Sequence, residues 1–153
     1  MSAETPRVPI PPPILYAVAI GLGLWLERPL PWPLPGGGVR FWFGALLIAL
    51  AVLLFGWCLR ELRVHQTTIN PHRAASNLVS SGPFRFSRNP IYVSLTVLLI
   101  GVGLLAASTW VLLMLAWLLP LMQRIVIARE EDHLRWRFGN EYADYCARVR
   151  RWL

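Results

Sequence analysis

Two arginines stand directly before a predicted helix start, and this arrangement favours the binding of an anion. Arg85 and Arg88 precede Asn89-Pro90 in the sequence, where Asn89 is typical of an N-cap and Pro90 of a first helical position. The free N–H groups of a first turn, the helix dipole and two guanidinium groups all attract negative charge. The spacing leaves two anions open, a lipid phosphate and a ligand carboxylate.

A second group of charged residues follows the last apolar stretch of the chain. Arg124 is followed by four more apolar residues before Arg129, so it either snorkels to the membrane interface or faces a partner or a cavity. On a regular helix Glu131 projects from nearly the same face as Arg124, and Glu130 projects about 100° away. Such a set can grip a small zwitterionic ligand, with its carboxylate on arginine and its ammonium on glutamate.

The composition indicates that a membrane positions these residues. Of the 153 residues 56% are hydrophobic and only 15% are charged, against roughly 25% charged residues in a soluble domain. This excludes a soluble globular, a disordered or a disulfide-based protein. The net charge of +7 comes entirely from arginines, which flank the apolar stretches. Membrane topology and anionic membrane lipids explain these arginines better than nucleic acid does, and the histidines show no metal-ligand spacing.

Four apolar stretches predict an all-α, polytopic membrane protein with about four transmembrane helices. An uncharged stretch over residues 91–123 would be about 50 Å long as one helix, so we divide it at a hairpin near Gly101, Gly103 and residues 106–109. The Pro- and Gly-rich stretch 29–38 predicts a loop. The predicted spans, in a single domain of residues 1–153, cover about 10–26, 41–59, 91–105 and 110–128.

The arginines also predict the orientation of the chain. Twelve of the fifteen lie in the loop 60–90 and in residues 124–153, so we expect both segments, both termini and any site to be cytoplasmic. The C-terminal segment 129–153 is amphipathic and is interrupted at Gly139, a typical C-cap residue. It predicts an interfacial helix region, a lid over a site at the membrane surface, or both. Its apolar residues recur at spacings of three and four: Leu134, Phe138, Tyr142, Tyr145, Val149 and Trp152.

The same residues resemble two motifs of a known family. Residues 82–92, Gly-Pro-Phe-Arg-Phe-Ser-Arg-Asn-Pro-Ile-Tyr, resemble the GPYRYxRHPxY motif of the isoprenylcysteine carboxyl methyltransferases and phospholipid (phosphatidylethanolamine) N-methyltransferases. Residues 130–145 resemble the EExxLxxxFGxEYxxY ending of these membrane enzymes. The resemblance covers roughly residue 67 to the C-terminus, and the first two spans match only in being apolar.

The resemblance implies a methyltransferase that uses S-adenosylmethionine, bound on the cytoplasmic side between the last two spans and the C-terminal helix. The acceptor would be a lipophilic or lipid-linked molecule that enters from the lipid, and neither a metal nor a covalent intermediate is required. Catalytic roles fall to Arg88, Asn89 and Glu130. The cofactor contacts it implies are Gly82, Pro83, Arg85, Arg88, Asn89, Pro90, Tyr92, Glu130 and Glu131, with Arg124 ahead of the two glutamates.

One position departs from the family pattern, because Asn89 stands where the motif has histidine. An asparagine cannot act as a general base near neutral pH, which favours a carboxylate or thiolate acceptor over an amine, although Glu130 or water could take a proton. The acceptor therefore stays open between a prenylated cysteine carboxylate, a phospholipid amine and a lipophilic thiol or acid. A rival of another class is a non-catalytic protein that binds anionic lipid or a partner, which would gain nothing from two adjacent carboxylates. The sequence indicates no oligomeric state.

Overall fold

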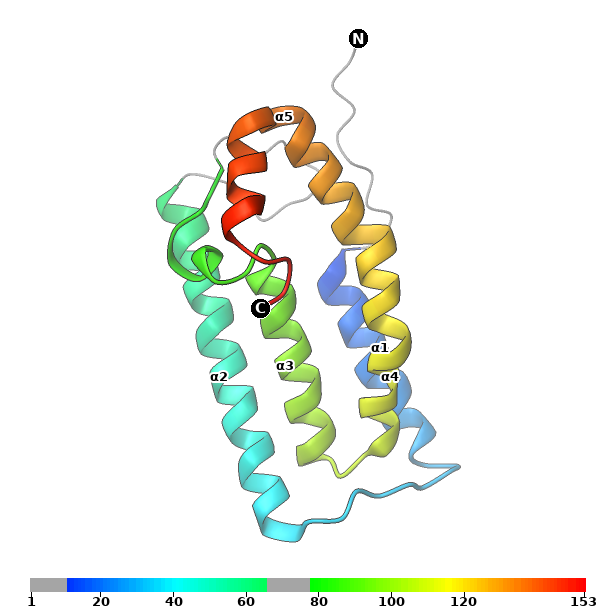
Figure 1. Ribbon diagram of the computed structural model, residues 1–153. Helices are drawn as coiled ribbons and strands as arrows, with labels where there is room; N and C mark the ends of the chain where they lie inside the picture. Colours follow the sequence, from blue (N-terminus) through cyan, green and yellow to red (C-terminus); the bar gives the residue numbers. More distant parts are fainter. Residues whose placement is uncertain (1–10, 66–77) are drawn as a thin grey trace.

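The computed structural model describes residues 11–65 and 78–153, which fold mainly into helices (Figure 1). Two of the helices, 3-10 η1 and π-helix η2, are short. The elements in chain order are α1 (Pro12–Leu26), α2 (Gly37–Val64), η1 (Gly82–Arg85), α3 (Pro90–Leu105), α4 (Thr109–Leu121), η2 (Met122–Ile127) and α5 (Ala128–Arg148). The first residue of the predicted span 10–26 and the histidine at position 72 lie outside the described residues.

The four predicted apolar stretches all form helices, and two of these are long and apolar enough to cross a membrane. They are Gly37–Val64, with 28 residues, and the continuous helical stretch Thr109–Arg148, with 40 residues. The apolar helices α1 and α3 have 15 and 16 residues, or about 22–24 Å at 1.5 Å per residue. A hydrocarbon core is about 30 Å thick, so the count of four complete spans stays a prediction.

Glycines let α2 and α3 pack closely, and the predicted hairpin forms at residues 106–108. A Cβ atom on Gly44 would lie 2.8 Å from the backbone nitrogen of Leu105, and one on Gly101 would lie 2.8 Å from the Ile48 side chain. Small residues of this kind allow close contact between membrane helices. The turn itself falls after α3, where Ala107 has a φ of 57° and the Ser108 side chain caps α4 by accepting from the N–H of Val111.

The two ends of the helix bundle hold different parts of the chain (Figure 1). At the loop end, the connection before α2 meets the turn between α3 and α4: Leu34 N–H donates to Ala107 O at 2.7 Å, and Thr109 N–H to Trp32 O at 3.2 Å. The motif end holds the end of α2, η1, the start of α3, and α5. The described parts of both arginine-rich segments therefore lie at one end, as the arginine pattern predicts.

Helix α5 folds back over the motif end. Gly139 lies inside it with φ 49° and ψ −120°, which is the break that the sequence predicts. The apolar face of α5 packs against the protein, because Tyr145 donates to the Phe84 carbonyl of η1 at 2.6 Å. A lid over a bound ligand stays a prediction. The cluster on this apolar face consists of buried Tyr142, Tyr145 and Val149, with Leu78, Leu134, Phe138 and Cys146 against them.

Candidate active site

The first motif (residues 82–92) is anchored to the end of α2. The Glu61 carboxylate accepts a hydrogen bond from the Ser81 hydroxyl, which also lies 2.8 Å from Nε2 of His65. Gly82 has a φ of +55°, and a Cβ atom there would lie 2.9 Å from the Glu61 carboxylate. The positive φ and the close carboxylate together explain why this position needs glycine.

Asn89 is the residue before α3, as predicted, but its side chain makes no capping hydrogen bond. Its Nδ2 atom instead donates to the carbonyl oxygen of Arg151 at 3.0 Å, and its backbone N–H donates to the Ser87 hydroxyl at 3.1 Å. The Asn89 amide is thus bound to segment 149–153, which follows α5. Sequence reasoning placed Asn89 correctly at the helix start and did not foresee this partner.

Arg88 lies at the centre of the site with a side chain only 14% exposed. Its Nη1 atom lies 3.3 Å from Oε1 of Glu131 and donates to the Cys146 sulfur at 2.7 Å. Its backbone N–H donates to Arg150 O at 2.9 Å. The buried Nε atom has no hydrogen-bond partner among the described residues. Arg88 is therefore fixed in place and still has an unused donor.

Glu131 is buried, with 3% of its surface exposed, and is surrounded by arginines. Arg151 binds it through two hydrogen bonds, Nε to Oε1 at 2.9 Å and Nη2 to Oε2 at 2.7 Å. Arg135 lies 3.6 Å from Oε2. We call Arg88, Glu131, Arg135 and Arg151 the arginine cluster. Arg135 also bonds the Asp132 carboxylate at 3.1 Å. Three guanidinium groups thus face two carboxylates, which leaves one positive charge in excess and suits an anion.

Glu130 belongs to a separate polar contact beside the cluster. The Tyr92 hydroxyl donates to its Oε1 atom at 2.7 Å. Glu130 lies in polar α5, beyond the apolar stretch. Burial raises the pKa of Glu130 to about 7, with a further increase from the Glu131 charge, while the Tyr92 hydrogen bond lowers it. A carboxyl group with a pKa near neutrality can exchange a proton at physiological pH.

Arg124 makes no contact with Glu131, and the ligand that the sequence places between them stays a prediction. Arg124 is exposed and lies in η2, where wider π turns shift the helical register. These turns closely follow Pro120 inside α4, which has no N–H for the bond to the carbonyl four residues earlier. Arg124 has no hydrogen bond or ion pair with any described residue. Arg85 is also exposed, with its guanidinium carbon 5.8 Å from the centre of the Phe86 ring.

Three contributors to the site carry no clear signal in the sequence. Arg151 resembles the exposed arginines around it, and Cys146 reads as an isolated thiol. Tyr16 lies in α1, outside both motifs, but it is 2% exposed and its hydroxyl is 2.8 Å from that of Thr96. The Thr96 hydroxyl in turn donates to the carbonyl of Tyr92 at 2.8 Å. A single tyrosine in an apolar helix was the one available hint of a polar contact.

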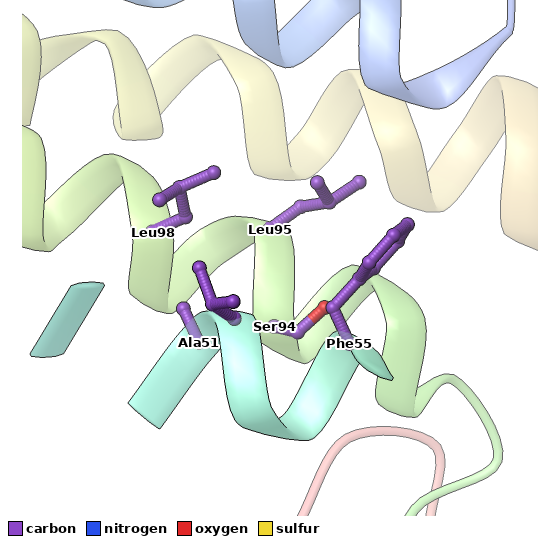
Figure 2. A pocket seen from close by; sticks show the side chains of 6 residues that line it. Ala51, Phe55, Ser94, Leu95 and Leu98 are labelled. Carbon is purple, nitrogen blue, oxygen red and sulfur yellow. The ribbon is translucent and has the colours of Figure 1, made fainter. Parts of the chain in front are cut away.

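An apolar cavity of about 150 Å³ lies between α2 and α3 (Figure 2). Ser94 is the one lining residue with a hydroxyl group. This hydroxyl donates to the Ile91 carbonyl at 2.6 Å, so it is not free to bind a ligand in the cavity. Ser94 follows Asn89 by five residues, or about 7.5 Å along the helix. The cavity is lined by Ala51, Val52, Phe55, Ser94, Leu95 and Leu98.

The sequence profile of the phospholipid methyltransferase family matches residues 39–141 of the chain. The chain belongs to this family. The match includes the whole first motif and both adjacent glutamates of the second. It therefore places Arg88, Tyr92, Glu130 and Glu131 in the region that the phospholipid methyltransferases share, and it confirms the family indicated by the two motifs. The chain is thus a membrane methyltransferase by family.

Relatives among curated proteins cover only parts of the chain. The nickel-cobalt-cadmium resistance protein NccN of Alcaligenes xylosoxydans xylosoxydans is 38% identical over 77 residues, which are 50% of this chain and 36% of that protein. The cobalt-zinc-cadmium resistance protein CzcN of Cupriavidus metallidurans is 31% identical over 106 residues, 69% of this chain and 45% of that protein. An uncharacterized protein of Haemophilus influenzae is 44% identical over 68 residues, 41% of this chain and its own full length. No solved structure matches the chain.

Proposed function

We propose that this protein transfers a methyl group from S-adenosylmethionine to a lipophilic acceptor at the cytoplasmic face of a membrane, as in isoprenylcysteine carboxyl O-methylation. The observation that carries the proposal is the meeting of the two motifs. Arg88 contacts Glu131 and Tyr92 contacts Glu130, so residues about 40 positions apart form one polar site at the arginine-rich end. Family membership supports the reaction class, and the arginine distribution supports the cytoplasmic side.

The described residues fit the charged groups of the methyl donor. The buried, unpartnered Nε of Arg88 and the surplus charge of the arginine cluster suit the donor's carboxylate. Glu130 carries the carboxylate that is not enclosed by arginines, and it suits the donor's ammonium group. This revises one expectation, because Glu131 is already bound by Arg151 and Arg88. We assign Glu131 to orienting Arg88 and not to direct contact with the donor.

When bound, S-adenosylmethionine would supply a methyl group on a sulfonium, which passes directly to a nucleophile as the carbon–sulfur bond breaks. The protein's part is to hold the two substrates in line and to exclude water. Arg88 and Glu130 hold one substrate, and α5 covers the site. Where the acceptor is an amine, Glu130 takes the proton that the product must lose.

The apolar cavity supports a lipophilic acceptor. Its lining offers no free polar side chain, and it lies along α3 from the site (Figure 2). The cavity is partly open, and its apolar lining suits a hydrocarbon chain. The engaged Asn89 amide supports a carboxylate or thiolate acceptor, whereas the near-neutral pKa of Glu130 supports a phospholipid amine. The surplus of arginine also supports the rival function, a non-catalytic protein that binds anionic lipid.

Calorimetric titration of the detergent-purified protein with S-adenosylmethionine and S-adenosylhomocysteine tests this proposal. We expect saturable binding by the native chain and no measurable binding by Arg88→Ala. The matched control is Arg137→Ala, which removes an exposed α5 arginine that stacks over Phe138, 5.7 Å from its centre. This control should bind like the native chain.

Two outcomes would overturn the proposal. One is the absence of donor binding by a folded sample with native lipid present, combined with binding to vesicles that contain an anionic phospholipid. That result would establish the lipid-binding function. The other is unchanged donor binding by Arg88→Ala, which would place the donor site elsewhere.

A further inference from the structure

We infer that Arg151 is a positioning residue for Arg88 and acts on it through Glu131. The inference rests on the proposed function, because it states how Arg88, which binds the methyl donor there, keeps its unpartnered Nε–H available to that ligand. Arg151 lies outside both motifs and outside the family match over residues 39–141. It belongs to segment 149–153, which crosses the start of α3.

Arg151, and not Arg88, is the principal partner of Glu131. Arg151 binds both carboxylate oxygens at 2.9 and 2.7 Å, the two-bond geometry in which arginine and carboxylate interact most strongly. Arg88 approaches only Oε1, at 3.3 Å, with one nitrogen. Without Arg151, the guanidinium group nearest to the buried Glu131 carboxylate would be that of Arg88. Arg88 would then turn its guanidinium group toward Glu131, and its N–H groups would no longer be available to a ligand.

The backbone of the same segment holds Arg88 independently of the Arg151 side chain. Arg150 O accepts from the Arg88 N–H at 2.9 Å, and Arg151 O accepts from Asn89 Nδ2 at 3.0 Å. A substitution of the Arg151 side chain leaves both carbonyl groups in place. The side-chain effect on Glu131 can therefore be separated from a general loosening of the segment.

The exposure of the three side chains fits a supporting role for Arg151. Its side chain is 33% exposed, against 14% for Arg88 and 4% for Glu131. Arg151 thus closes the cluster from its outer side, where a substitution creates little buried space. We expect Arg151 variants to fold, and thermal unfolding of each variant checks this.

Donor affinity and kinetics of Arg151→Gln and Arg151→Lys, in detergent with native lipid, test the inference. We expect Arg151→Gln to raise the dissociation constant and the KM for S-adenosylmethionine about tenfold, with kcat at saturating donor within about twofold. Arg151→Lys should give a smaller increase, because lysine keeps the charge and loses the two-bond geometry. The control Arg148→Gln removes an exposed arginine at the end of α5 and should leave the affinity unchanged.

A double-variant cycle decides whether Arg151 acts through Glu131. In a Glu131→Gln background, Arg151→Gln should cause no further loss of affinity, since no carboxylate remains to draw Arg88 away. If the native chain binds S-adenosylmethionine and Arg151→Gln leaves the affinity unchanged, this inference alone is overturned. The same holds if Arg151→Gln lowers the affinity equally in both backgrounds. A native chain that does not bind the donor overturns the proposed function and the inference with it.

Discussion

Two carboxylates, one at each end of the bundle, are held in opposite ways. At the loop end, Glu27 accepts from the Trp32 N–H and the Ser108 hydroxyl, both at 2.6 Å. These donors are neutral, and they tie the connection before α2 to the turn before α4. At the motif end, Glu131 is buried among three arginines. The first arrangement joins two loops, whereas the second leaves surplus positive charge.

This difference supports the proposed function at the motif end. Neutral donors already satisfy the Glu27 carboxylate, so its contacts hold the two loops together. A cluster with more guanidinium groups than carboxylates is favourable only if an anion or solvent completes it. Under the proposed function, the buried, unpartnered Nε of Arg88 would face that anion. Arg40, at the loop end, also has a buried Nε with no hydrogen-bond partner among the described residues.

The largest expected effect comes from removing each carboxylate in turn. Glu131→Ala leaves buried arginine without its counter-charge and should lower the free energy of unfolding by about 3–5 kcal/mol. Glu27→Ala leaves two neutral donors unpaired and should cost about 1–3 kcal/mol. Unfolding in mixed detergent micelles measures both, with the exposed Glu141→Ala as control. Equal losses at Glu131 and Glu27 would contradict the distinction between the two ends.

A second prediction separates stability from donor binding. A Cβ atom on Gly44 would lie 2.8 Å from the Leu105 backbone nitrogen and 2.9 Å from the Gly101 carbonyl oxygen. Gly44→Ala should therefore cost about 1–3 kcal/mol of unfolding free energy and leave donor affinity unchanged. Gly56→Ala is the matched control in the same helix, because a Cβ atom there meets nothing within 4 Å. A lowered donor affinity in folded Gly44→Ala would show that the two ends are coupled.

The smallest effect concerns the ionisation of Glu130, whose pKa is raised to about 7. Between about pH 4.3, the ordinary glutamate value, and pH 7, the folded state holds a proton that the unfolded state lacks. The contribution of Glu130 to the free energy of unfolding is therefore fully present below this pH range and is lost as the pH rises through it. Tyr92→Phe removes a hydrogen bond that lowers this pKa, so the decline should move to higher pH. Unfolding free energies measured from pH 4 to 8 check this, and Glu130→Gln should show no such decline.

Much of the fold could be predicted because its signals are local. The four apolar stretches, the start of α3 at Asn89-Pro90 and the break at Gly139 follow from residue types and short spacings. The predicted hairpin is confirmed at residues 106–108, although Gly101 itself lies inside α3, because a glycine can either break a helix or let a second helix approach. Only the neighbouring helix decides between these, and here Ile48 of α2 lies against Gly101.

The residues of the candidate site could be predicted from the sequence, but the contacts between them could not. Both motifs, and therefore Arg88, Tyr92, Glu130 and Glu131, could be chosen from the sequence. The predicted alignment of Arg124 with Glu131 assumed 3.6 residues per turn, and the π turns of η2 change that register. The different roles of the two adjacent glutamates were also unpredictable, since one meets Tyr92 and the other meets three arginines.

The sequence by itself determined the family, the apolar helices and the residues that form the polar end, because these depend on composition, periodicity and short motifs. The tertiary structure alone decided which arginine meets which carboxylate. Arg88 and Arg151 lie on either side of Glu131 in the chain, with Arg151 20 residues away, and no local spacing brings them together. An ion pair depends on distance and burial in space, and only the folding of α5 and segment 149–153 over the start of α3 sets these.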